Sequence, residues 1–135
     1  MSRSTKLVTA AYILSYVAAK APDQITTDAI AKAVEDHPAR VRQIVAALVK
    51  ADLLTSVRGA NGGVTLARPP AQINFRDVYK AVEDQPMLSL ALGEQVTGWA
   101  DKCKVYPIFS RLYDDLEEKM LSELARHRLN QLYNK

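Results

Sequence analysis

The stretch Arg58-Gly59-Ala60-Asn61-Gly62-Gly63-Val64-Thr65-Leu66-Ala67-Arg68 decides the fold of this chain. It places three glycines and an Asn-Gly pair between two short runs rich in β-forming residues, 55–57 and 64–66. Because Asn and Gly tolerate positive φ better than other residues, the stretch predicts a tight β-hairpin. An arginine is expected at each base of this hairpin, Arg58 on one side and Arg68 on the other.

Two helical patterns precede the hairpin, over residues 26–34 and 38–54. Thr26 or Thr27 can cap the first helix, and Pro38 suits the first position of the second, where its missing N–H would have no partner anyway. The second helix is expected to bury residues spaced three and four apart: Val41, Ile44, Val45 and Leu48. Two helices joined by a short turn and followed by a basic hairpin predict a winged helix-turn-helix, a mostly α fold with a small β-hairpin wing.

Charge is unevenly distributed along the 135 residues. Residues 1–68 carry nine Lys and Arg against five Asp and Glu, whereas residues 69–135 carry nine against ten. The basic excess therefore coincides with the predicted helices and wing, as contact with DNA phosphates requires. Taken alone, such an excess would also fit an ordinary solvated surface.

The exposed face of the second helix carries the candidate DNA contacts. At about 100° per residue, this face holds Ala39, Gln43, Ala46 and Lys50, flanked by Arg40, Arg42 and Ala47. Alanines permit close approach to another surface, and Arg and Gln can make paired hydrogen bonds to base edges. We expect Arg40, Arg42 and Gln43 to read bases, with Ala39 permitting the approach. Further DNA contacts are expected at Lys50, Arg58, Asn61, Gly62 and Arg68. The alternative is a face selected for helix propensity alone.

The chain divides into three predicted regions: a DNA-binding domain over 1–84, a linker or sensor region over 85–106 and a dimerisation helix over 107–135. Asn74 is expected to cap a helix over 75–84 that packs back on the first domain. The last helix has a long apolar stripe, on which the predicted dimer contacts are Ile108, Leu112, Leu116 and Met120. A second copy of the chain is the expected cover, since helix-turn-helix proteins read paired half-sites as two-fold dimers. The alternative is packing of the stripe within the same chain, on an N-terminal helix that Ser4 can cap, and both kinds of packing are expected.

Several function classes find no support in the sequence. It contains no paired carboxylates, Ser/His/Asp set or metal-spaced His/Cys cluster, and no Gly-Lys-Ser/Thr follows Gly59–Gly63, so we expect no enzyme. One cysteine excludes an intrachain disulfide, and no apolar run is long enough to span a membrane, so a cytoplasmic location is expected. A winged helix used only for protein contact is the more serious competitor, and the salt dependence of binding separates the two.

The wing and the helix that follows it resemble a known family. Arg58–Arg68 with its Gly62-Gly63 pair, then Ile73-Asn74-Phe75-Arg76-Asp77-Val78-Tyr79-Lys80-Ala81-Val82-Glu83, closely resembles the bacterial regulators typified by IscR, NsrR and CymR, the Rrf2 family. The resemblance covers nearly the whole chain. It implies a dimeric winged-helix transcription factor, in most cases a repressor, that binds a pseudo-palindromic operator. It also implies that the second helix enters the major groove, that the wing contacts the neighbouring backbone or minor groove, and that the C-terminal helix forms the dimer.

Cys103 is where the chain departs from the cluster-binding members of that family, which carry three closely spaced cysteines in this region. The resemblance therefore implies the cluster-free branch, without a cofactor, whose members are proposed to sense through a single thiol. Lys102 and Lys104 flank Cys103 just ahead of a helix, and both features stabilise a thiolate. We expect a response to oxidants or electrophiles. The alternatives are a small side chain filling a gap beside Trp99, and a small-molecule effector bound between Trp99 and the last helix.

Overall fold

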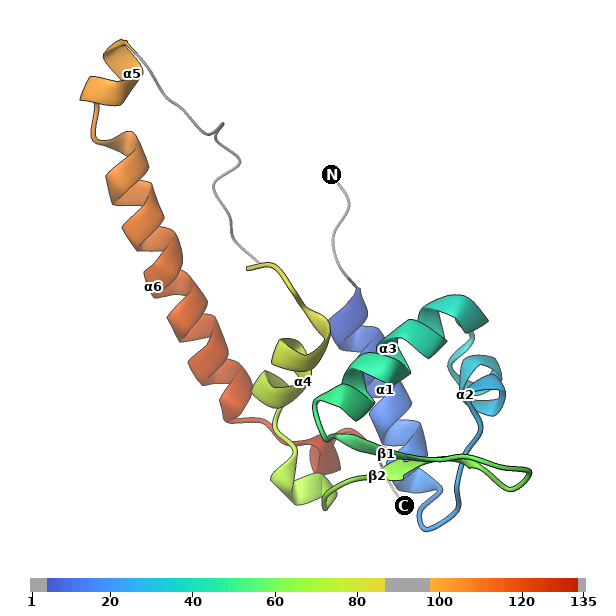
Figure 1. Cartoon of the computed structure of the whole chain (residues 1–135). Coiled ribbons are helices and arrows are strands. Elements are labelled where there is room, and N and C mark those ends of the chain that lie inside the picture. The colour runs from blue at the N-terminus through green and yellow to red at the C-terminus, as the bar shows by residue number, and fades with distance from the viewer. Residues whose placement is uncertain (1–4, 87–97, 134–135) are drawn as a thin grey trace.

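The computed structural model describes residues 5–86 and 98–133. Along the chain, its elements are α1 (Lys6–Ala19), α2 (Thr27–Val34), α3 (Pro38–Lys50), β1 (Leu54–Val57), β2 (Gly63–Leu66), the 3₁₀ turn η1 (Pro70–Gln72), α4 (Phe75–Val82), α5 (Trp99–Lys102), α6 (Val105–Ala125) and the 3₁₀ turn η2 (Leu129–Gln131). Figure 1 shows α1 to α4 and the hairpin gathered at one end, with α6 extending away from them. The predicted fold class, mostly α with a β-hairpin wing, is confirmed.

The core lies where α1, α3 and α4 meet. The four residues predicted to form the inner face of α3 are all buried: Val41, Ile44, Val45 and Leu48. From α1, Ile13, Leu14 and Val17 are fully buried, and Ile30 of α2 joins the same cluster. Burying a Leu or Ile side chain stabilises the fold by about 1.5–3 kcal/mol, so this cluster holds α3 in a fixed orientation.

Helices α2 and α3 begin at the predicted signals, whereas α3 ends earlier than predicted. Thr26 Oγ1 accepts a hydrogen bond from Ala29 N (3.1 Å) at the start of α2, and α3 begins at Pro38. However, α3 ends at Lys50 instead of reaching Leu54, because Asp52 adopts a left-handed conformation (φ 60°) that turns the chain into β1. The apolar Leu54 then belongs to the strand, where it is buried.

The hairpin pairs β1 and β2 in antiparallel register from Leu54 opposite Leu66 to Val57 opposite Gly63. The prediction that Asn61-Gly62 would supply the positive φ angles is wrong, because these angles occur at Gly59 (117°) and Gly63 (152°). Gly62 is needed for space instead, since a Cβ atom there would lie 2.3 Å from the Val57 carbonyl oxygen.

A short bridge fastens the wing to the body of the domain. Val64 N donates to Ile25 O (2.9 Å) and Ile25 N donates to Val64 O (3.1 Å). The close approach requires glycine at position 63, where a Cβ atom would lie 2.7 Å from Ile25 O. The wing is therefore held at a set position beside the start of α2.

The C-terminal segment differs from the predicted continuous helix. α6 begins at Val105, two residues before Pro107, and ends at Ala125. The chain then returns to the domain, where Leu129 N donates to Ile73 O (2.8 Å) and the Leu129 side chain is buried in the core. The last described residues thus pack with the helices of the N-terminal part of the chain. Half of the predicted 85–106 region, residues 87–97, lies outside the described residues.

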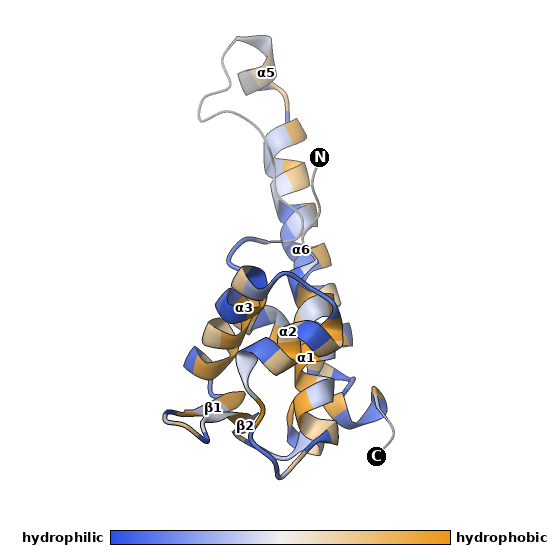
Figure 2. Cartoon of the chain, turned by 90° about the vertical axis from the view of Figure 1, so that its right-hand side faces the viewer, coloured by the Kyte–Doolittle hydropathy of each residue, from blue (hydrophilic) through white to orange (hydrophobic). Residues whose placement is uncertain are grey.

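Apolar residues are also present on the part of α6 that extends away from the other helices (Figure 2). Figure 2 shows apolar segments recurring along α6 toward the end that is remote from the domain. Within the described ranges, no helix combines the length and the apolar character needed to cross a membrane.

Candidate nucleic-acid interface

The exposed ridge of α3 consists of Ala39, Gln43, Ala46 and Lys50, and all four residues are exposed. The ridge lies opposite the buried face, as the 3.6-residue period of the helix requires. Two of its members are alanines, so the helix backbone can approach a flat or grooved partner closely. Gln43 supplies a side-chain amide that can both donate and accept hydrogen bonds, and Lys50 supplies a cation.

Arg42 lies on the flank of α3 that faces α2. Its Nη1 atom is 3.6 Å from Oδ1 of Asp28, in the first turn of α2. Both side chains are exposed, with 59% of the Arg42 side chain and 87% of the Asp28 side chain accessible. Arg42 is therefore oriented by a carboxylate and still available to a ligand. Asp28 could not be singled out from the sequence, because a carboxylate in the first turn of a helix is ordinarily explained by the helix dipole.

Arg40 lies on the opposite flank, and its guanidinium is occupied within the protein. Nη1 donates to Thr9 Oγ1 (2.9 Å) and to Asp36 Oδ2, and Nη2 donates to Thr5 Oγ1. These bonds join the start of α3 to the start of α1. Within one protomer, the donors of Arg40 are directed at oxygen atoms of α1 and of the α2–α3 turn. The base contact expected at Arg40 stays a prediction.

Asp36 completes this cluster as a charged group. The His37 backbone N–H donates to Asp36 Oδ1 (2.7 Å), and this bond, with the neighbouring Arg40, lowers the pKa of the Asp36 carboxyl below its ordinary value of 3.8, against an opposing effect of burial. The i, i+4 spacing of Asp36 and Arg40 was the available sequence signal for this pair.

The tip of the wing is basic and open. Arg58 begins the loop after β1, so it lies at the tip of the hairpin and not at its base, and both Arg58 and Asn61 are exposed. A groove of about 360 Å³ separates the wing from the start of α2, lined by Thr26, Thr27, Ser56 and Arg58 among others. Gly62 is half-buried and serves the turn geometry described above.

Arg68 stands at the open end of the wing and binds back to the domain. Its Nη1 atom lies 3.3 Å from Asp77 Oδ2 and donates to Gln72 O (3.4 Å), while Nε donates to Asp52 O (3.5 Å). About one third of the side chain is exposed (35%). Within one protomer, Arg68 therefore joins the wing to the first turn of α4. The DNA contact expected at Arg68 stays a prediction.

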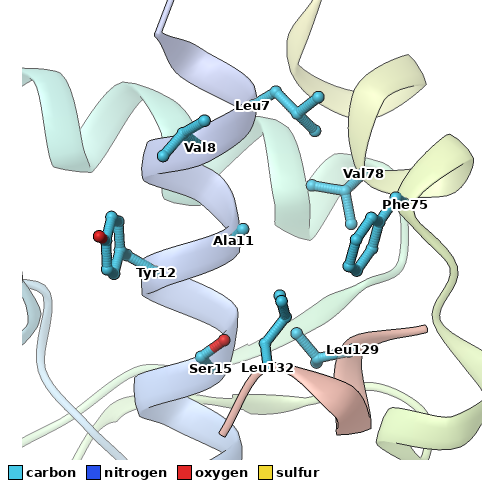
Figure 3. A pocket seen from close by; sticks show the side chains of 9 residues that line it. All are labelled: Leu7, Val8, Ala11, Tyr12, Ser15, Phe75, Val78, Leu129 and Leu132. Atoms are coloured by element: carbon cyan, nitrogen blue, oxygen red, sulfur yellow. The ribbon is translucent and has the colours of Figure 1, made fainter. Parts of the chain in front are cut away.

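Two apolar surfaces remain uncovered in a single protomer. On α6, the exposed large hydrophobic residues are Val105, Tyr106, Ile108, Phe109, Leu112 and Leu116. Of the predicted dimer residues, Met120 alone is partly covered within the protomer. The second surface is a groove of about 460 Å³ between α1, α4 and η2 (Figure 3). Its rim includes Val8 and Tyr12, which are 59% and 64% exposed.

Cys103 is half-buried at the end of α5 and precedes Lys104, after which α6 begins. Lys102 and Lys104 are both exposed. Trp99, the expected cover for this cysteine, is 80% exposed, so a gap-filling role for Cys103 beside it finds no support within one protomer.

Comparisons with known proteins agree with this geometry. Residues 3–135 match the model of the Rrf2 family, described as an iron-dependent transcriptional regulator. The chain is similar to YwnA of Bacillus subtilis, named as an HTH-type transcriptional regulator, with 30% identity over 97% of this chain and 96% of the relative. A crystal structure described as that of a DNA-binding protein superposes with a TM-score of 0.78 at 28% identity, covering 96% of this chain and all of that one. CymR of B. subtilis, described as a global cysteine regulator, has the same fold, with a TM-score of 0.70 at 22% identity over 98% of this chain and 95% of that chain.

The family description names iron, and the donor set of this chain does not suit an iron–sulfur cluster. Such clusters are held mainly by several cysteine thiolates, whereas Cys103 is the one cysteine of the sequence. Among the described residues, no three His, Cys, Asp or Glu side chains lie close enough to share a metal ion. Residues 1–4, 87–97 and 134–135 contain neither Cys nor His. We therefore assign no iron-bound step to this chain.

Replacing Arg40 with Ala is expected to lower stability while leaving the preference for particular bases unchanged. The substitution removes the bonds from α3 to Thr5 and Thr9 of α1, and a shift of roughly 2–5 °C in the thermal midpoint follows for a domain of this size. Circular dichroism melts and binding to a library of base-substituted duplexes measure the two effects. Loss of preference at a single base position, with the melt unchanged, would return Arg40 to the reading face.

Proposed function

The chain belongs to the Rrf2 family of DNA-binding transcriptional regulators, and we propose that it acts as a homodimer that represses transcription from a pseudo-palindromic operator. The observation that carries the DNA-reading part is the ridge of α3, with Gln43 exposed at its centre and Arg42 on its flank. A role on chromosomal DNA places the protein in the bacterial cytoplasm, and occupancy of an operator that overlaps a promoter would exclude RNA polymerase.

The side chains divide by the kind of DNA contact they suit. Gln43 and Arg42 can each present two hydrogen-bonding atoms to one base, Gln43 to adenine and Arg42 to guanine. Ala39 and Ala46 leave the space for that approach. Lys50 and Arg58 are exposed cations at the end of α3 and at the wing tip, where they suit phosphate or the minor groove. Asn61 lies on the same loop as Arg58.

Gln43→Ala should weaken operator binding by about 1–3 kcal/mol and relax the preference at one position of each half-site. Lys50→Ala and Arg58→Ala should instead weaken all sequences alike, and each should lower the salt slope of binding by about one. Operators selected from random duplexes by the purified protein, titrated at several salt concentrations, provide the measurement.

Two results would count against this assignment. Sequence-blind losses of equal size at Gln43, Lys50 and Arg58 would mean that α3 is not the reading helix. Binding to DNA that does not weaken with added salt would favour the competing function, a winged helix used only for protein contact.

The dimer proposal rests on the apolar face of α6. Six large apolar side chains stay exposed along it in one protomer, whereas soluble monomers rarely leave an extended apolar patch uncovered. A stable interface buries about 800 Å² on each partner, and a helix of 21 residues is long enough to supply much of that area. A second copy of the chain offers a matching apolar face by symmetry.

The groove between α1, α4 and η2 is also suited to a second copy of the chain. Val8 and Tyr12 add apolar surface at its rim, and Leu132 is 43% exposed on its other side. Charge is complementary as well: α6 carries five acidic and two basic residues, whereas α1 carries one lysine and no acid. We assign the groove to the α6 helix of the second protomer, which would place each α6 against the DNA-binding domain of its partner.

Leu112→Asp and Leu116→Asp should each weaken self-association by at least about tenfold, because an unpaired carboxylate is costly to bury. Ser122→Asp, an exposed position on the same helix outside the apolar face, is the matched control and should leave the association unchanged. Sedimentation velocity at micromolar concentration measures the effect. A monomeric wild-type protein, or dimers of Leu112→Asp and Leu116→Asp as tight as the control, would contradict the proposal.

The switch is proposed to be Cys103. This thiol is partly accessible, lies between two exposed lysines and is two positions before Val105, the first residue of α6. The thiolate is the form of a cysteine that reacts with oxidants and electrophiles. Oxidation or alkylation adds bulk and polarity at the start of α6. A change in the angle between the two protomers would then misplace the paired α3 helices on half-sites spaced by about 34–36 Å.

Peroxide or a quinone should release the operator from the wild-type protein but not from Cys103→Ser. Specific binding exceeds non-specific binding by about 4–10 kcal/mol, so even a partial misfit should produce a large loss of affinity. Operator affinity before and after treatment, with both proteins in parallel, is the measurement. Equal responses in the two proteins, or none, would reject the thiol and favour a small-molecule effector bound near Trp99 and α6.

A further inference from the structure

We propose that Asp28 of α2 is a specificity-determining residue: it orients Arg42 for guanine and keeps it from the DNA backbone. The proposal rests on the base-reading role proposed above for α3. Asp28 lies on α2, outside the reading helix α3, and pairs with Arg42 on the flank of α3.

The position of Arg42 on α3 explains why its side chain has to be oriented. On a helical wheel at about 100° per residue, Arg42 lies about 70° from the middle of the exposed ridge, on the side of α2. A long, flexible side chain at the edge of a reading face has two kinds of acceptor within reach, base edges and phosphates. Phosphate carries no sequence information, so an unrestrained Arg42 would add affinity for every DNA sequence.

Asp28 is placed to restrain it. Its Oδ1 atom lies 3.6 Å from Nη1 of Arg42, across the gap between α2 and α3. With Nη1 facing the carboxylate, the Nε and Nη2 donors form the remaining edge of the guanidinium. Two parallel N–H groups on one edge match the O6 and N7 acceptors of guanine.

The charge of Asp28 acts in the same direction. In helix-turn-helix proteins the helix preceding the recognition helix crosses the DNA backbone. Asp28 is 87% exposed in the first turn of α2, so its carboxylate opposes phosphate at this edge of the domain. Paired with Arg42 it forms a neutral unit that adds nothing to sequence-blind attraction. The pair thus costs some total affinity and raises the difference between the correct site and other DNA.

The experiment compares Asp28→Asn with Asp23→Asn. Asp23 is an exposed acid in the turn between α1 and α2, so its replacement removes the same charge without touching Arg42. Each full-length protein is titrated with an operator selected by the wild type from random duplexes and with a scrambled duplex of equal length, over a range of salt concentrations. The same titrations are repeated with Arg42→Ala and with the double variant.

For Asp28→Asn we expect tighter binding to the scrambled duplex, with a salt slope steeper by about 0.9, and an operator-to-scrambled ratio about tenfold lower. Asp23→Asn should change both duplexes alike and keep the ratio. In the Arg42→Ala background, Asp28→Asn should no longer alter the ratio. The proposal is overturned if Asp28→Asn behaves like Asp23→Asn, or if its effect on the ratio persists without Arg42. A wild-type protein that selects no sequence at all would instead reject the base-reading role of α3.

Discussion

The packing of one face of α3 against α1 is the constraint on which the rest of the molecule depends. Because Val41, Ile44, Val45 and Leu48 are all buried, the period of the helix leaves only the opposite ridge for a partner. The same rotation sends Arg40 toward α1 and Arg42 toward α2. Positions 40, 42 and 43 are neighbours in sequence, and burial of the inner face directs the three side chains to different sides of the helix.

The features that depend on residues close together in the sequence could be predicted from the sequence. The inner face of α3, the Thr26 and Asn74 caps and the antiparallel hairpin all follow from spacing and residue type, and all are present. The roles of Arg40 and Arg68 could not be predicted in this way. Their partners Thr9 and Asp77 lie 31 and 9 residues away, on other elements. A helical wheel separates buried from exposed positions but does not reveal which neighbour an exposed side chain meets.

The segment that follows α6 returns to the core and connects the C-terminal end of α6 to α4. Leu129 enters the core, and Phe75 N donates to His127 O (3.0 Å), so the base of α6 is bonded to the start of α4. Tyr79 Oη also donates to Glu117 Oε1 (3.0 Å), which joins the two helices farther along. Helix α6 is therefore joined to α4 at two positions along its length, and α4 in turn packs against α3.

Three of the described arginines share a common arrangement. Arg40, Arg42 and Arg68 each face an aspartate: Asp36, Asp28 and Asp77, respectively. For Arg58, at the wing tip, the described residues include no such ion-pair partner. Every cation free to neutralise a phosphate raises affinity for all DNA sequences, whereas discrimination comes from groups fixed against base edges. Pairing three arginines with aspartates limits such sequence-blind attraction. Under the proposed function, preference for one site would then depend on few contacts, in which the geometry of Arg42 and Gln43 matters more than the net charge.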